Sequence, residues 1–181
     1  LPVASFCVEQ GRWTKRGNES ADSFATSKNS IATKEGKLAV RKAENQSEVW
    51  KSVAKAQESL SRNIGKDVKP AASASSLQLT LEDKDLKAKL KAFQVTLLPL
   101  VEAHPRSLGF VYAINGEINS AEIFAGHDLF RRVWPKLVDG MATEAVALTD
   151  GAKANTPPSA DAVRDFIAQA EKVAAFEKPL S

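Results

Sequence analysis

The stretch SLGFVYAINGEINSAEIF, residues 107–124, carries the strongest structural signal in the chain. Two runs rich in β-branched and aromatic residues flank the pair Asn115-Gly116. A two-residue type I′ turn requires a positive φ at both of its central residues, and Asn and Gly tolerate that conformation best. The sequence therefore predicts an antiparallel β-hairpin over residues 108–124.

The turn also fixes the expected pairing of the two strands, because a two-residue loop sets the register. The predicted pairs are Ile114 with Glu117, Tyr112 with Asn119, Phe110 with Ala121 and Gly109 with Glu122. Both faces of such a hairpin are mostly apolar, so we expect it to lie centrally in a sheet. The run VASFCVEQ over residues 3–10 is the expected neighbouring strand, since it too is apolar on both faces.

Helical patterns precede the hairpin. A short helix is expected over residues 35–45, and a longer one begins with Ser47 as N-cap and ends at Gly65. Thr80 with Asp83 fits a capping box for a third helix. That helix carries an apolar stripe, and we expect Pro99 to bend its last turns before the chain leaves it at residues 104–105.

Two further helices are expected after the hairpin. A long one opens at residues 126–128 and contains Pro135, which removes one backbone hydrogen bond. The last follows the Pro-Pro-Ser turn at residues 157–159. The predicted fold class is therefore α+β: a small mixed or antiparallel sheet with the central hairpin 108–124, packed with four to five helices.

Residues 1–181 are expected to form a single domain, since this length suffices to bury a core. Residues 66–76 (KDVKPAASASS) have the composition of a linker with nothing to bury, and residues 14–34 read as a mobile surface loop. Hydrophobic residues make up 43% and charged residues 26% of the chain, which is typical of a globular protein.

Charge and composition exclude several classes of function. A net charge of +3, with the basic residues of the N-terminal half spread out along the chain, does not indicate nucleic-acid binding. No apolar run reaches the roughly 18 residues of a membrane span. The opening LPVASF has no basic start, so export is neither indicated nor excluded, and localisation stays open.

The stretch CVEQGRW, residues 7–13, concentrates candidate chemistry: the single cysteine, Cys7, lies close to Glu9, Arg12 and Trp13. Cys7 is a candidate nucleophile, but a thiol needs a base or positive charge to form thiolate. The alternative is an inert strand cysteine that packs as a small hydrophobe. A bulge at Gly11 could bring Glu9 and Arg12 together and orient the guanidinium toward an anion; the alternative is an ordinary surface ion pair.

Three stretches carry a resemblance to a known family. They are CVEQGRW at residues 7–13, QSEVW at residues 46–50, and GFVYAINGEINSAEIFAGHDLFRRVWPKL at residues 109–137. Together they resemble the ARPP family, a bacterial domain whose name records association with rhodanese-phosphatase-type proteins. Members of that family are longer, so the chain resembles an excerpt. The resemblance implies a mixed fold and no established activity.

One ligand site follows from the predicted sheet. If the strand 3–10 lies beside the hairpin, Arg12 and Trp13 come close to Glu122, and the helix that carries Gln46 covers them. We therefore predict a cleft lined by Arg12, Trp13, Gln46 and Glu122 that suits a small polar or anionic ligand; a carboxylate that simply reaches water is the alternative for Glu122. No metal or other cofactor is expected, because His104 and His127 lack any spacing typical of metal ligands.

Two functions remain open from the sequence. The first is a non-catalytic module that binds a small ligand or a protein, since no phosphate loop, dinucleotide fingerprint or nucleophile elbow is present. The second is a hydrolase-like or thiol-dependent enzyme that uses Cys7, Glu9 and Arg12. The oligomeric state, the substrate and the redox compartment do not follow from these residues.

Overall fold

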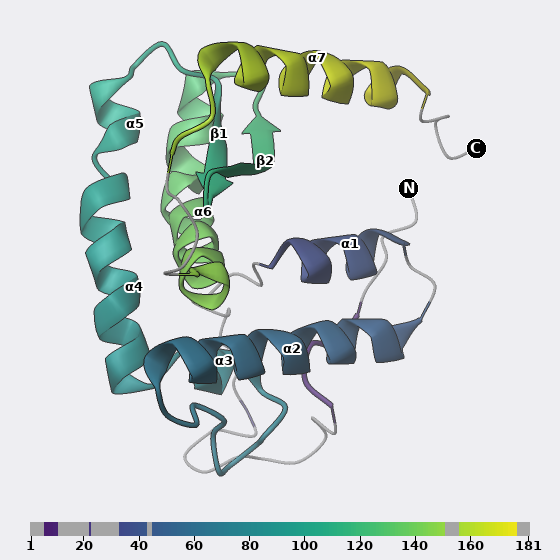
Figure 1. Ribbon diagram of the computed structural model, residues 1–181, viewed down its shortest axis with the longest axis vertical. Helices are drawn as coiled ribbons and strands as arrows, with labels where there is room; N and C mark the ends of the chain where they lie inside the picture. The colour runs from purple at the N-terminus through teal and green to yellow at the C-terminus, as the bar shows by residue number, and fades with distance from the viewer. Residues whose placement is uncertain (1–5, 11–21, 23–32, 43–44, 151–155, 177–181) are drawn as a thin grey trace.

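The computed structural model describes residues 6–10, 22, 33–42, 45–150 and 156–176. Within these residues lie seven helices and one two-stranded antiparallel sheet (Figure 1). They are α1 (Lys34–Lys42), α2 (Gln46–Ile64), α3 (Leu77–Thr80), α4 (Lys84–Leu97), α5 (Leu100–Ala103), β1 (Gly109–Ile114), β2 (Glu117–Ile123), α6 (His127–Leu148) and α7 (Ala160–Phe176). Five of these helices have nine residues or more, so the predicted α+β fold is confirmed.

The long helices form a frame around the hairpin. Helix α2 crosses one end of the molecule, α4 and α5 follow one side, and α7 lies at the end opposite α2 (Figure 1). Helix α6 runs beside α4, and α1 lies between α2 and the hairpin. Among the described residues, no helix combines the length and the apolar character that a membrane span requires.

Short polar side chains set where the helices begin. Asn45, and not Ser47 as predicted, is the N-cap of α2, because its side chain accepts the N–H of Ser47 at 2.9 Å. Asp83 alone caps α4, with its carboxylate accepting the N–H groups of Asp85 and Leu86. The predicted capping box fails because Thr80 belongs to α3, where its hydroxyl donates to the carbonyl of Ser76. Gly65 ends α2 at φ 80°, as predicted.

Pro99 divides the third predicted helix into two. Proline has no N–H to continue the helical ladder, so α4 ends at Leu97 and α5 begins at Leu100. The carbonyls of Leu97 and Leu98 at this break both accept the indole N–H of Trp134, at 3.2 Å each. Pro135, by contrast, is accommodated inside α6.

One hydrophobic cluster joins α2, α3, α4 and the second half of α6. Its members are Val53, Leu60, Val68, Leu77, Leu81, Leu86, Leu90, Ala142, Val146 and Ala147. Val68 is only 4% exposed, so the prediction that residues 66–76 bury nothing is wrong at this position. Val68 is held there because its N–H donates to the hydroxyl of Ser61.

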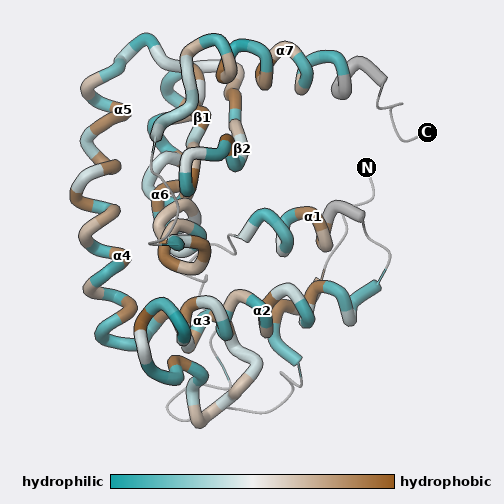
Figure 2. Tube along the Cα trace, in the orientation of Figure 1, coloured by the Kyte–Doolittle hydropathy of each residue, from teal (hydrophilic) through white to brown (hydrophobic). Residues whose placement is uncertain are grey.

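A second cluster places the first half of α6 beneath the hairpin. It consists of Val101, Phe130, Trp134, Val138 and Met141, and Phe110 and Tyr112 of β1 pack against it. Phe110 meets Trp134 edge to face at 5.3 Å between ring centroids, a favoured geometry for aromatic pairs. Hydrophobic and hydrophilic residues alternate along α4 and α6, so each helix has one apolar face to offer these clusters (Figure 2).

The hairpin turn forms as predicted, but its register changes. Asn115 and Gly116 have φ values of 53° and 79°, as a type I′ turn requires. Ile114 pairs with Glu117, but a β-bulge opposite the step from Tyr112 to Ala113 makes Tyr112 pair with Ser120 and Phe110 with Glu122. The predicted pairs beyond the turn are therefore wrong by one residue. Asn119 is the additional residue of this bulge.

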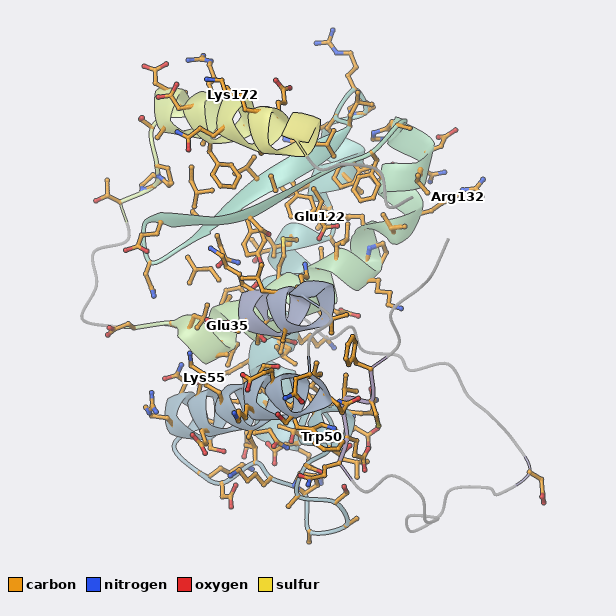
Figure 3. The ribbon with its side chains drawn as sticks, turned by 90° about the vertical axis from the view of Figure 1, so that its right-hand side faces the viewer. Glu35, Trp50, Lys55, Glu122, Arg132 and Lys172 are labelled. Atoms are coloured by element: carbon orange, nitrogen blue, oxygen red, sulfur yellow. The ribbon has the colours of Figure 1, made fainter. Side chains whose placement is uncertain are left out.

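The neighbours of the hairpin differ from the prediction. Residues 6–10 have no strand structure, so the predicted strand 3–10 is wrong there, and residues 3–5 lie outside the described part. Helix α7 instead lies against the hairpin on the side opposite α6 (Figure 3). Its apolar side chains, Val163, Phe166 and Ile167, are half-buried. Helices α6 and α7 thus lie on opposite sides of the hairpin.

Gly109 provides a test of the observed register. A Cβ added to Gly109 would lie 2.1 Å from the backbone oxygen of Glu122, whereas one added to Gly126 would meet nothing within 4 Å. Gly109→Ala should therefore lower the free energy of unfolding by about 2 kcal/mol or more, since backbone atoms have to move. The control Gly126→Ala should cost under about 1 kcal/mol. Urea denaturation measures both, and equal costs would contradict the register.

Candidate functional site

Gln46 binds the backbone of Cys7. The backbone N–H of Cys7 donates to the Gln46 side-chain oxygen at 3.0 Å, and the Gln46 amide nitrogen donates to the Cys7 carbonyl at 2.6 Å. Gln46 is the first residue of α2, so this two-way contact fixes residues 6–10 to the start of that helix. The amide that was predicted to line a ligand cleft is therefore used within the chain.

Glu9 anchors the same segment from its other side. It is only 6% exposed, and its carboxylate accepts the hydroxyl of Ser73 at 2.6 Å. The hydroxyl of Ser75 donates to the carbonyl of Gln10 at 3.0 Å, and Val8 packs against the first hydrophobic cluster. The described part of the CVEQ motif thus joins α2 to the loop that precedes α3.

The thiol of Cys7 is exposed, so the prediction of a packed strand cysteine is wrong. Its Sγ donates to the carbonyl of Glu9 at 2.9 Å. A carbonyl accepts a hydrogen bond from a thiol but cannot take its proton, so this contact does not generate the thiolate that a nucleophile requires. Both histidines have structural positions. His104 is the C-cap of α5, and His127 Nδ1 lies 2.8 Å from the carbonyl oxygen of Ser107.

The predicted ligand cleft stays a prediction, because Arg12 and Trp13 lie outside the described residues. Its two other members have partners of their own. Gln46 binds Cys7, and Glu122 on β2 forms an ion pair with Lys37 of α1 at 3.0 Å. The side chain of Glu122 is 32% exposed, which agrees with a carboxylate at the edge of solvent.

A cluster that the sequence did not reveal surrounds Glu144 of α6, whose exposed fraction is 0%. Its Oε1 accepts the backbone N–H of Lys34 at 2.5 Å. Its Oε2 accepts the amide of Asn119 at 2.9 Å and the hydroxyl of Tyr112. Asn119 also donates to the Tyr112 hydroxyl, at 2.6 Å. We call Tyr112, Asn119, Glu122 and Glu144 the α1 seat, because Glu122 and Glu144 bind α1 and the other two side chains bind Glu144.

The first turn of α1 supplies positive potential to this cluster. Helix N-termini favour negative charge, since their first N–H groups have no partner within the helix. Lys34 is the first residue of α1, and its N–H donates to Glu144. Thr33, which precedes the helix, is buried and accepts the N–H of Gly36 through its hydroxyl at 3.1 Å. A buried carboxylate and a helix start therefore satisfy each other.

A shallow hollow of about 20 Å³ lies between α1, α2 and the end of α6. Its lining comprises Thr33, Glu35, Ser52, Lys55, Ala56, Ser59, Ala147 and Leu148. Lys55 and Glu35 face one another across it at 4.0 Å (Figure 3). This volume accommodates about one water molecule.

The family model of the ARG and Rhodanese-Phosphatase-superfamily-associated Protein domain matches residues 1–179. The chain belongs to this ARPP family. No curated protein and no solved structure matches it. In this ARPP domain, the three stretches that carried the resemblance contribute to the contacts described above. The first stretch binds Gln46 of the second, and the third provides Tyr112 and Asn119, which bind Glu144.

In the part of the ARPP domain that the structure describes, no three His, Cys, Asp or Glu side chains gather in a way that could hold a metal ion. The signal for Glu144 was its position three residues after Met141, on the buried face of α6. A charged residue in an apolar stripe indicates an internal partner, because an unpaired charge is costly to bury.

Tyr112 gives this cluster a spectroscopic probe, because it is the single tyrosine of the chain. Burial first, and then the hydrogen bond and negative charge of Glu144, raise the pKa of Tyr112 well above its ordinary value of 10.0. The folded ARPP domain should therefore show no tyrosinate absorbance near pH 10, whereas the urea-unfolded chain should titrate there.

The same shift predicts how stability depends on pH. A raised pKa contributes stability that is fully present below the unfolded pKa of 10.0 and is lost as the pH rises above it. The free energy of unfolding should therefore fall above about pH 10. Ionisation of Tyr112 at its ordinary pKa in the folded state would contradict the described cluster.

Proposed function

We propose that the chain is a non-catalytic protein-binding module, and that its docking surface is the open end of the hairpin. This surface comprises Leu108, Ile123 and Leu129, which are 49%, 66% and 51% exposed. Exposed large apolar side chains that gather in one place are typical of protein interfaces. Their exposure at this end is the observation that carries the proposal.

The backbone brings these three residues to the same end of the molecule. Leu108 precedes β1, and its carbonyl accepts the N–H of Phe124 at 2.8 Å, directly after Ile123 ends β2. Leu129 lies in the first turn of α6, which begins four residues after β2 ends. All three side chains are exposed, so a partner could reach them without moving a helix.

The size of the hollow beside α1 favours a protein partner over a small ligand. Sites for drug-sized molecules usually enclose roughly 300–1,000 Å³, whereas this hollow encloses about 20 Å³. Two of the side chains expected to bind a small ligand are also engaged, since Gln46 binds Cys7 and Glu122 binds Lys37. Recognition of a protein surface needs neither a large enclosed volume nor these polar side chains.

The family description indicates the class of partner to test. It records association with proteins of the rhodanese-phosphatase superfamily. We therefore take such a protein as the first candidate partner, which would hold the catalytic chemistry while this chain provides binding. The thiol-dependent enzyme has less support, because the Cys7 thiol donates to a carbonyl and the Glu9 carboxylate accepts a hydroxyl.

A matched pair of substitutions tests the proposed surface. Ile123→Lys places a charge at the open end of the hairpin, and Val95→Lys places one on α4 at a nearly equal exposure, 66% against 65%. Calorimetric titration with a purified rhodanese-phosphatase-superfamily protein should show binding that Ile123→Lys weakens by at least about tenfold. Val95→Lys should leave the affinity unchanged. Absence of binding, or an equal loss in both variants, would refute the proposal.

A further inference from the structure

Helix α1 contributes little to the hydrophobic core of the molecule. None of its described side chains belongs to either hydrophobic cluster, and Leu38, its largest apolar side chain, is 46% exposed. Its nine residues are too few for a helix that is stable alone. The contacts that hold it therefore decide whether it stays in place.

Two of these contacts reach the α1 seat. The N–H of Lys34 donates to Glu144, and the side chain of Lys37 binds Glu122. The second pair is partly exposed, at 46% and 32%, so solvent weakens it. The bond to the buried carboxylate is the stronger one, because hydrogen bonds to charged groups exceed neutral ones.

Helix α1 also contacts α2, but the ion pair between them is weak. The hollow that contains Thr33 and Glu35 lies in this contact, so packing there is incomplete. The ion pair between Lys55 and Glu35 spans 4.0 Å, and its side chains are 70% and 45% exposed. Such a pair contributes little to stability.

Three members of the α1 seat belong to elements that other contacts hold in place without α1. Tyr112 is on β1 and packs against the second hydrophobic cluster, Asn119 belongs to the bulge of β2, and Glu144 is on α6. Removal of α1 would leave these elements in contact with one another. It would also return water to a carboxylate that is costly to bury.

We infer that α1 is a latch: it detaches from the α1 seat while the helical frame and the hairpin stay folded, and its detachment uncovers Glu122 and Glu144. Two opposing effects set this equilibrium. The donors from α1 stabilise the closed state, and rehydration of Glu144 stabilises the open state. The latch concerns a different surface from the hairpin end proposed as the docking site, so the two proposals fail independently.

Lys34 allows a direct test, because it is the first residue of α1 and its side chain is exposed. Proline suits the first position of a helix and lacks the N–H, so Lys34→Pro deletes the donor to Glu144 and preserves the helix. Lys34→Ala keeps the donor and removes only the side chain. Hydrogen exchange of the backbone amides of residues 37–42, compared with those of residues 53–60 in α2, reports the opening.

In the wild-type chain, the α1 amides should exchange at least on the order of a hundredfold faster than those of α2, at a rate that low urea does not change. Lys34→Pro should accelerate exchange in α1 by about a further tenfold and leave α2 and the hairpin unchanged. Lys34→Ala should behave as wild type. Equal exchange in α1 and α2, an unchanged rate in Lys34→Pro, or the same acceleration in Lys34→Ala would overturn the latch.

Discussion

A carboxylate inside the protein must be surrounded by donors, and Glu144 imposes this requirement on three separate parts of the chain. Its exposed fraction is 0%, and its donors come from the start of α1, from Tyr112 on β1 and from Asn119 on β2. A missing donor would leave a buried carboxylate oxygen without its partner, at a cost of about 1–3 kcal/mol. The positions of α1 and the hairpin relative to α6 are consequently coupled through one side chain.

The bulge in β2 is best understood through this requirement. A regular hairpin would pair Asn119 with Tyr112, but the observed register pairs Tyr112 with Ser120 and frees Asn119 to bind both Tyr112 and Glu144.

The N-terminal motif also has a structural role, in another part of the molecule. Cys7 and Glu9 join α2 to the loop before α3, through Gln46 and Ser73. Residues that looked chemically active thus hold elements together, and the surfaces left for recognition lie elsewhere.

The sequence predicted what depends on local conformation. The turn at Asn115-Gly116 and the helix end at Gly65 require positive φ values that few residues adopt, so their residue types suffice. It did not predict the bulge, the buried role of Glu144 or the absence of a strand at residues 6–10. These depend on contacts between residues 25 to 110 positions apart, such as Asn119 or Lys34 with Glu144, and no local pattern encodes such contacts. The predicted cleft of Arg12, Trp13, Gln46 and Glu122 assumed that strand.

The central claim is that Glu144 and its donors act as one unit, and a double-mutant cycle measures this directly. Urea denaturation of the wild type, Tyr112→Phe, Glu144→Gln and the double variant gives the coupling between the two side chains. The account predicts a coupling of about 1–3 kcal/mol, because Tyr112→Phe deprives a buried charge of a donor only while Glu144 is present. Additive losses, within about 0.5 kcal/mol, would show that the two residues act independently and would contradict it.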